Sequence, residues 1–166
     1  MPGAADGSVK SVYVEGGTPA QIASLQSSPR DVVLDATSVY WSNADTSGGN
    51  GGSIMKATLG TSDATSIVSN LSLPEGLTVA SSGVYWTEFS TGSVMKASLS
   101  GSSPVLLAPG NYPYRIVADK SAVYWTNEGT AASDPADGNI VRYDLSQGPG
   151  GAVSYTHLTL PTNREV

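Results

Sequence analysis

The 166-residue chain contains no cysteine and a single histidine, His157. It therefore offers no disulfide, no thiol nucleophile and no cluster of histidines for zinc. No apolar run approaches the roughly 20 residues of a membrane-spanning helix, and no basic and then apolar leader opens the chain. Eight Lys and Arg against 14 Asp and Glu give a net charge of −6, and the cations are scattered. We therefore expect neither a nucleic-acid partner nor a membrane span in this chain.

Long segments with helical periodicity are also missing, and 19 glycines and 10 prolines are spread through the sequence. Both residues interrupt helices, which disfavours an array of stacked helical repeats. The chain consists instead of short segments rich in β-branched and aromatic residues, bounded by Gly, Pro, Asn and Ser. Such segments predict an all-β fold.

All three tryptophans belong to a Val-Tyr-Trp tripeptide, which ends at Trp41, Trp86 and Trp125. A proline stands twelve positions before each tryptophan, and a Gly-x-Ile/Val stretch follows it. With Gly7 counted as an earlier marker, successive glycine markers are 45, 40 and 46 residues apart. Periods of about 40 to 50 residues are typical of helical pairs or of four-stranded propeller blades. The strand-like segments favour blades.

Side chains alternate along a strand, so Val39 and Trp41 are predicted on one face of a blade and Tyr40 and Ser42 on the other. Large side chains on both faces suit a sheet packed between two neighbours. Directly after two of the Gly-x-Ile/Val stretches, Met-Lys pairs at 55–56 and 95–96 predict a packing methionine beside an exposed lysine.

The spacing predicts a partial β-propeller of about three and a half four-stranded antiparallel blades. Its units are a half-blade at 7–28 with strands at 9–14 and 20–25, full blades at 29–70 and 74–108, and an incomplete blade at 113–152. Closed propellers have four to eight blades, so this array leaves faces and strand edges uncovered. We expect the chain alone to aggregate or to be poorly stable. A monomer that melts cooperatively would contradict this.

The unit Val-Tyr-Trp-Thr/Ser-Asn/Glu, with Pro-x-x-Ile/Leu before it and Gly-x-Val/Ile-Met-Lys after it, resembles the Tyr-Trp-Thr-Asp repeat propellers of the low-density lipoprotein receptor class. The resemblance covers about residues 7–148 and implies a six-bladed parent. The family's aspartate, which helps to tie blades together, is replaced by Asn43, Glu88 and Asn127. The nearer likeness is to bacterial propellers of unassigned function, many of which look exported. It implies an extracellular, periplasmic or surface parent protein.

The last fourteen residues, Val153–Val166, fit neither the repeat nor its composition. They resemble the translation of a transposase adapter used in DNA library preparation, so residues 1–152 are interpreted as the native propeller and 153–166 as a non-native tail. A natural polar tail is the alternative. We expect Ser154 and Tyr155 to pair at the open sheet edge whatever their origin. Because Gly7 lies in mid-blade, Met1 is interpreted as an internal methionine or a false start.

The units differ in length mainly between each tryptophan and the next marker glycine, which are 11, 6 and 13 residues apart in the three units. In an antiparallel meander this variable loop lies on the same side as the connection between blades. Binding residues concentrate in loops displayed by a rigid scaffold. The candidate ligand-face residues lie in these loops and connections: Asn43, Asp45, Asn50, Glu88, Tyr112, Tyr114, Arg115, Asn127, Asp134 and Asp137.

Two interpretations stay open for most of these residues. The segments 43–50 and 134–138 carry the oxygen side chains of a calcium loop but lack its spaced carboxylates and closing glutamate, which favours solvated turns. Tyr112, Tyr114 and Arg115 flank Pro113 at a predicted channel entrance. They suit stacking on a sugar or peptide, and packing between blades is the alternative.

These features favour a non-catalytic binding or interaction propeller with a protein, peptide or glycan ligand. We predict no catalytic, cofactor-binding or metal-binding residue and no cofactor in this chain. One alternative is part of a propeller enzyme, such as a lactonase-like hydrolase or a lyase, with its catalytic residues in other blades. Another is a purely structural module of a larger surface protein.

Overall fold

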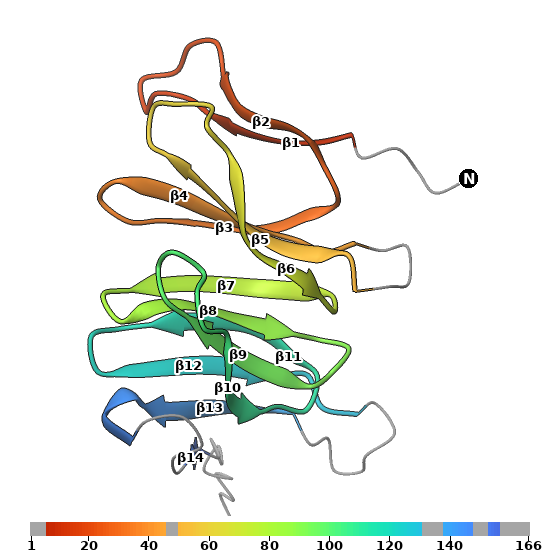
Figure 1. Cartoon of the computed structure of the whole chain (residues 1–166). Helices are drawn as coiled ribbons and strands as arrows, with labels where there is room; N and C mark the ends of the chain where they lie inside the picture. Colours follow the sequence, from red (N-terminus) through yellow and green to blue (C-terminus); the bar gives the residue numbers. More distant parts are fainter. Residues whose placement is uncertain (1–5, 46–49, 131–137, 148–152, 157–166) are drawn as a thin grey trace, which may run out of the picture.

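The computed structural model describes residues 6–45, 50–130 and 138–147 and the backbone of 153–156. Regular structure in these ranges is β-strand, apart from one short 3-10 helix, η1 (Leu145–Gln147). The strands form four antiparallel sheets, each of which follows the chain as a meander, and the sheets stack face to face (Figure 1). The chain is therefore an all-β, partial β-propeller, as predicted.

Each sheet corresponds to one unit of the repeat. The half-blade contains β1 (Gly7–Ser11) and β2 (Ala20–Gln26). The first blade contains β3 (Pro29–Leu34), β4 (Ser38–Asn43), β5 (Gly52–Thr58) and β6 (Thr65–Leu71). The second blade contains β7 (Pro74–Ala80), β8 (Gly83–Glu88), β9 (Ser93–Ala97) and β10 (Val105–Pro109). The third blade contains β11 (Pro113–Ala118), β12 (Ala122–Asn127), β13 (Asn139–Asp144) and β14 (Val153–Thr156).

The repeated sequence gives a repeated strand register. Each tryptophan pairs across its blade with the aliphatic residue three positions after the proline: Trp41 with Val32, Trp86 with Leu77 and Trp125 with Ile116. The first strands β3, β7 and β11 contact one another from blade to blade, which identifies the inner edge of the array.

Alternating side chains on the tryptophan strands fill the spaces between blades. Val39 and Trp41 pack against Val9 and Ala23 of the half-blade. Tyr40, on the opposite face, joins the next cluster with Leu77 and Trp86 of the second blade. The predicted division of faces is confirmed.

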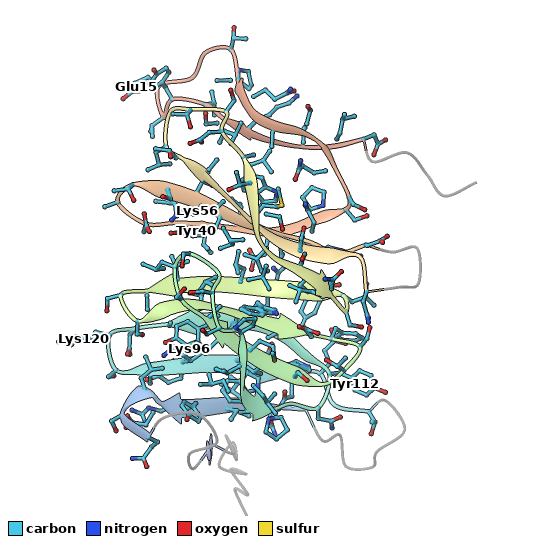
Figure 2. The ribbon with its side chains drawn as sticks, viewed as in Figure 1. Glu15, Tyr40, Lys56, Lys96, Tyr112 and Lys120 are labelled. Carbon is cyan, nitrogen blue, oxygen red and sulfur yellow. The ribbon has the colours of Figure 1, made fainter. Side chains whose placement is uncertain are left out.

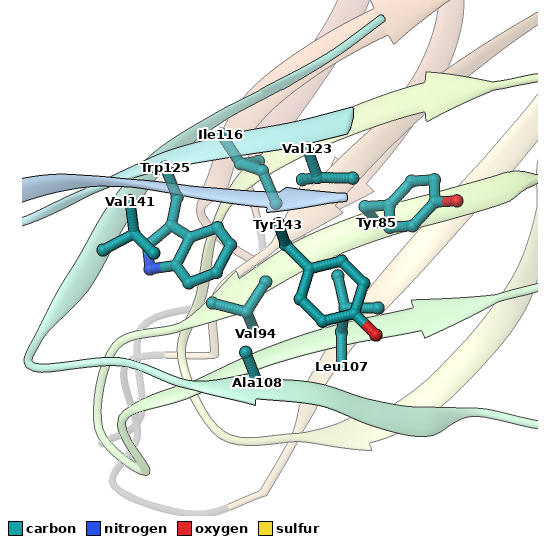
Figure 3. Packing of buried hydrophobic residues seen from close by; sticks show 9 residues of the cluster. All are labelled: Tyr85, Val94, Leu107, Ala108, Ile116, Val123, Trp125, Val141 and Tyr143. Carbon is teal, nitrogen blue, oxygen red and sulfur yellow. The ribbon is translucent and has the colours of Figure 1, made fainter. Parts of the chain in front are cut away.

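The same arrangement recurs between the second and third blades, where Tyr85 packs toward Val123 and Trp125 (Figure 3). All three tryptophans are almost completely buried. Burial of an aromatic side chain of this size contributes on the order of 2–3 kcal/mol, so the tripeptide stabilises the stack.

The predicted exposed lysines are instead half-buried. The ammonium of Lys56 lies 5.1 Å from the ring centroid of Tyr40, and that of Lys96 lies 5.5 Å from the ring centroid of Tyr85. Both are cation–π contacts. Lys56 and Tyr40 lie together beside the first blade in Figure 2. The lysines are not exposed as predicted, because the second and third strands of each blade pair with each lysine directly opposite a tyrosine.

Strand boundaries differ from the prediction in the half-blade. The strand predicted at 9–14 ends at Ser11, and Val12, Tyr13 and Val14 are exposed. No second strand pairs with the free edge of β1 among the described residues, so apolar residues there gain no partner. A pattern of β-branched residues could not reveal that missing partner.

Residues 153–156 form the outer strand of the third blade. β14 pairs with β13 in antiparallel register, from Ile140 opposite Thr156 to Tyr143 opposite Val153. The expected pairing of Ser154 and Tyr155 at this edge is thus observed, and the blade predicted as incomplete has four strands. Edge pairing requires only backbone hydrogen bonds, so it carries no information on the origin of the segment. Residues 157–166, including His157, lie outside the described ranges.

Candidate ligand-binding rim

The three residues that replace the family's aspartate lie buried at the ends of the tryptophan strands. Asn43, Glu88 and Asn127 occupy the last positions of β4, β8 and β12, and their side chains bond to neighbouring parts of the fold. Sequence analysis placed them among the ligand-face residues. Their burial makes them contacts of the framework beneath that face.

In the first blade, Gln26 supplies the acceptor for the tryptophan. Its Oε1 accepts hydrogen bonds from Trp41 Nε1 and from Asn43 Nδ2, both at 2.9 Å. Gln26 ends the outer strand of the half-blade, so this pair of bonds links the half-blade to the first blade.

In the second blade, Leu71 stands where Gln26 stands in the first and cannot accept a bond. Glu88 replaces that acceptor: Oε1 accepts from Trp86 Nε1 at 3.1 Å and Oε2 accepts from Ser72 N at 3.3 Å. The extra methylene of glutamate relative to asparagine lets one side chain reach both donors.

In the third blade, the corresponding position is Gly110, which has no side chain. Asn127 Oδ1 accepts from Asn111 N at 3.1 Å, and its Nδ2 donates to Asn139 Oδ1 at 2.8 Å. Trp125 Nε1 is buried without a hydrogen-bond partner. The locking bond of the other blades is therefore absent here.

The calcium-loop candidates do not come together as a site in the described residues. Asp45 is half-buried beside Gly51, and Asn50 is exposed. Asp134 and Asp137 lie outside the described ranges. No three His, Cys, Asp or Glu side chains approach closely enough to hold a metal ion in the part of the chain that the structure describes.

An aromatic group lies on the rim where the variable loops are. The ring centroids of Phe89 and Tyr112 are 5.2 Å apart at 51°, and those of Phe89 and Tyr114 are 6.3 Å apart in an edge-on arrangement. Tyr112 keeps 42% of its surface exposed. Phe89, Tyr112, Tyr114 and Arg115 together are the rim cluster, and Tyr112 lies at the edge of the molecule in Figure 2.

A repeated turn positions the rim cluster. The residue before each strand-one proline has a left-handed backbone, with φ of 51° at Ser28, 50° at Leu73 and 54° at Tyr112. The carbonyl of this residue accepts a bond from the residue three positions after the tryptophan, at 3.2 Å from Phe89 N to Leu73 O. The turn thus brings the start of each variable loop to the entrance of the inner strand.

Arg115 joins the rim cluster to the inner edge of the array. Its guanidinium lies 5.1 Å from the ring centroid of Tyr114, and Nη1 lies 3.7 Å from Asp31 Oδ2 of the first blade. Asp31 Oδ2 also accepts a bond from Leu77 N at 2.9 Å. The arginine side chain remains largely exposed.

A second ion pair lies on the inner strands. Arg30 Nε lies 3.7 Å from Glu75 Oε1. Burial raises the pKa of the Glu75 carboxyl, and Arg30 and Arg115 oppose that rise by stabilising the charged form. The inner edge therefore carries charges of both signs beside the aromatic rim.

Sequence analysis identified Tyr112, Tyr114 and Arg115, which the structure brings together. It missed Phe89 and the inner-strand charges at Arg30, Asp31 and Glu75. Phe89 is the only phenylalanine in the chain and begins the shortest variable loop, a signal that was present in the sequence. The ion pairs join different blades, so no spacing within a unit reveals them.

No protein-family model matches this sequence, and no curated protein matches it either. Among solved structures, the chain is similar to a nidogen/laminin complex, with a TM-score of 0.71 and 20% identity over 92% of this chain and 59% of that chain. It is also similar to streptogramin B lyase, with a TM-score of 0.67 and 16% identity over 96% of this chain and 50% of that chain. A third similar structure is a luciferin-regenerating enzyme, with a TM-score of 0.64 and 14% identity over 85% of this chain and 51% of that chain.

Similarity at these identities establishes the propeller architecture alone. The chain spans between about half and three fifths of the length of these structures. They include a protein complex and two enzymes, so the fold is compatible with binding and with catalysis. No helix of the described residues is long and apolar enough to cross a membrane.

Proposed function

We propose that this chain is part of a six-bladed binding or interaction propeller, which presents the rim cluster to a protein, peptide or glycan and catalyses no reaction. The observation that carries this proposal is the partly exposed aromatic group of Phe89, Tyr112 and Tyr114 beside the arginine Arg115. Exposed aromatic rings stack on sugars and on peptide side chains, and a neighbouring guanidinium donates directional hydrogen bonds.

The inner-strand charges support the same location. Arg115 contacts Asp31 on one side and Tyr114 on the other, which directs its exposed guanidinium along the inner edge beside the aromatic rings. The net charge of −6 disfavours nucleic acid as the ligand. The parent protein is proposed to be exported, on the resemblance to exported bacterial propellers.

Binding to the rim is tested with the full chain on peptide and glycan arrays, followed by calorimetry on each hit. Tyr112→Ala and Phe89→Ala are expected to weaken binding at least tenfold, since truncation of an interface aromatic typically costs about 2 kcal/mol or more. Tyr13→Ala is the matched control, because Tyr13 is 82% exposed in a turn far along the chain from the rim cluster. Equal losses in all three variants, or unchanged binding in the rim variants, would refute the proposal.

An enzyme remains the second candidate, because two of the similar structures are named as enzymes. In this chain Glu75 is the inner-strand carboxyl with a raised pKa, which suits proton transfer better than an ordinary glutamate. A screen of lactone and lyase substrates with the full-length parent and its Glu75→Gln variant distinguishes the two candidates. Turnover that this substitution abolishes would favour the enzyme.

The full-length gene bears on the remaining proposals. Two further whole blades with the two strands that complete the half-blade, a lipid-attachment motif or a signal peptide would support a six-bladed exported parent, and appended domains would favour the structural-module alternative. Adapter nucleotides in the contig beyond the codon of Ala152 would support a non-native tail. An uninterrupted genomic match through codon 166 would contradict it.

A further inference from the structure

Charged residues are divided unevenly between the two halves of each blade. The rim half contains the first halves of strands one and three, the last halves of strands two and four, and the loops that join them. The opposite half contains the turns from strand one to two and from strand three to four. Tyr112 lies in the rim half, at the right of Figure 2, and Glu15 and Lys120 lie in the opposite half, at its left.

An excess of acidic residues lies in the rim half. Six carboxyl groups and two guanidinium groups of the described residues belong to it, which leaves a formal side-chain charge of −4. The opposite half carries five groups of each sign, so its charges cancel. The rim half therefore holds all of the net side-chain charge of the described residues. Its acidic residues are Asp6, Asp31, Asp45, Glu75, Glu88 and Glu128, and its basic residues are Arg30 and Arg115.

Both arginines of the rim half are already paired with carboxylates. Arg30 Nε lies 3.7 Å from Glu75 Oε1, and Arg115 Nη1 lies 3.7 Å from Asp31 Oδ2. Each pair cancels one positive and one negative charge. The excess of negative charge therefore comes from the other acidic residues of the rim half, and these arginines do not offset it.

One of these carboxylates lies next to the rim cluster. Glu128 follows Trp125 by three positions and begins the third variable loop, as Phe89 begins the second. Its backbone N donates to Tyr112 O at 3.0 Å, so it is a direct neighbour of that tyrosine. Glu128 is exposed. An accessible negative charge therefore accompanies the exposed ring of Tyr112.

A second carboxyl responds to Glu128. Burial raises the pKa of Glu75, Arg30 and Arg115 lower it, and the negative charge of Glu128 adds to the rise. Glu75 lies on β7 one position after its proline, as Tyr114 does on the neighbouring strand β11. The two acidic side chains thus repel one another beside the rim cluster. A cation placed between them would relieve this repulsion.

We propose that the rim cluster binds a basic peptide, with a lysine or arginine side chain that packs on Tyr112 and places its charge beside Glu128. The inference rests on the proposed binding function, whose ligand it narrows to one class. Basic side chains suit such a surface because their stems pack on aromatic rings while their charged ends reach carboxylates. The exposed guanidinium of Arg115 retains N–H groups for carbonyls of the same peptide.

The other ligand classes fit this charge less well. A neutral glycan gains nothing from the excess of −4, and a glycan or peptide with carboxylates meets charge of its own sign. A nucleic acid is disfavoured on the same ground. Charge complementarity therefore separates classes that the aromatic rings alone do not.

The first experiment measures binding of the full chain to three immobilised libraries of short random peptides. The libraries share their aromatic and aliphatic residues and differ at the remaining positions, which carry Lys and Arg, Gln and Ser, or Glu and Asp. We expect the bound sequences to come from the basic library and to bind about tenfold more tightly than their neutral counterparts. Raising the ionic strength from about 0.05 M to about 0.5 M should remove most of that difference.

Two matched variants separate binding at the rim from attraction to the acidic chain as a whole. Glu128→Gln and Glu15→Gln each remove one exposed carboxylate, the first at the rim and the second at a turn of the opposite half. We expect Glu128→Gln to weaken binding of the basic peptides about three- to fivefold and to change binding of their neutral counterparts little. Glu15→Gln should change neither.

A charge reversal tests the contact directly. In Glu128→Lys the preference should shift toward the acidic library, because the variant offers a cation where the wild-type chain offers a carboxylate. Glu128 is exposed, so these substitutions remove no buried packing.

Three outcomes would overturn the inference while the proposed function stands, all of them with binding that Tyr112→Ala weakens. They are equal binding of the three libraries, equal effects of Glu128→Gln and Glu15→Gln, and binding to a glycan array without binding to the basic library. Failure of the proposed function differs, because Tyr112→Ala and Phe89→Ala would then leave binding of every library unchanged. Such a result, or no binding at all, would overturn both.

Discussion

At the scale of single residues, the repeat maintains one bond by changing two positions together. Trp41 donates to Gln26, whereas Trp86 donates to Glu88 because Leu71 stands where Gln26 would be. A buried indole N–H without an acceptor costs on the order of 1–3 kcal/mol, which explains why an acceptor is supplied from either side. Trp125 lacks both solutions.

Asn127→Glu is expected to be about 1 kcal/mol more stable than Asn127→Asp, because both lose the bond from Asn127 Nδ2 to Asn139 Oδ1 but only the longer carboxylate can accept from Trp125 Nε1, as Glu88 accepts from Trp86. Its second oxygen can retain the bond from Asn111 N, as Glu88 does with Ser72 N. Asn127→Asp adds the same charge without the reach and is the matched control. Urea denaturation of the three proteins measures the effect, and equal stability of the Asp and Glu variants would contradict the explanation.

Asp63 is expected to contribute to the loss of stability in acid. Bonds from the Thr61 hydroxyl and from Thr58 lower its pKa from 3.8 to about 2. A carboxyl with a lowered folded pKa stabilises the fold above its unfolded pKa and loses that contribution as the pH falls from about 4 through 2. Asp63→Asn should flatten the stability profile in that window. Urea midpoints from pH 5 to pH 2 test this, and parallel profiles would show that Asp63 makes no difference.

At the scale of elements, the segment that contains the outer strand is one residue shorter before the third blade than before the first and second blades. The marker glycine and the next proline are 22 residues apart in two units and 21 in the third. β2 and β6 contain a bulge with a left-handed residue, Leu25 at φ 54° and Asn70 at φ 61°. β10 has no bulge there, and its residue 109 is a proline, which cannot adopt positive φ. The shorter spacing thus corresponds to one bulge fewer.

Asn70→Val is expected to destabilise the chain by roughly 1–2 kcal/mol, because a β-branched residue is strained in the left-handed region. Asn70→Gly should leave stability within about 0.5 kcal/mol, since glycine adopts that conformation freely. Asn70 is exposed, so loss of packing does not confuse the comparison. Thermal and urea unfolding provide the measurement, and similar losses in both variants would argue against backbone strain.

At the scale of the whole molecule, blades are joined by a hydroxyl relay as well as by apolar packing. Thr87 accepts from Gly76 N and donates to Tyr114 O, so one side chain connects three strands of two blades. Thr126 makes only the bond within its own blade.

Thr87→Val is therefore expected to cost about 1–3 kcal/mol, because the isosteric change removes the bonds to the buried Gly76 N and to the half-buried Tyr114 O. Thr126→Val, which removes one exposed bond, should cost less than about 1 kcal/mol. Both variants are compared by urea denaturation. Equal costs would show that the relay between blades contributes little.

The prediction from sequence was most successful where the repeat itself carries the information. Strand order and the two faces of the tryptophan strands agree with the structure, because local register repeats with the motif. The predicted exposure of Lys56 was wrong, because its burial depends on Tyr40, which lies opposite it on the neighbouring strand. The site was partly found: Tyr112 and Arg115 were identified from their place beside Pro113, whereas Asp31 joins them from a blade more than eighty residues earlier.

Sequence alone determined the architecture, because a unit that cannot bury its apolar faces by itself must stack with copies of itself. Only the tertiary structure decided which chemistry each position has. Asn43, Glu88 and Asn127 occupy one motif position, yet they bond differently because residues of the preceding strand differ. The same holds for Tyr40, Tyr85 and Tyr124: the first two are completely buried between blades, whereas no following blade covers Tyr124 in the part of the chain that the structure describes. Burial and pairing depend on neighbours distant in the chain, and those neighbours are brought together only by folding.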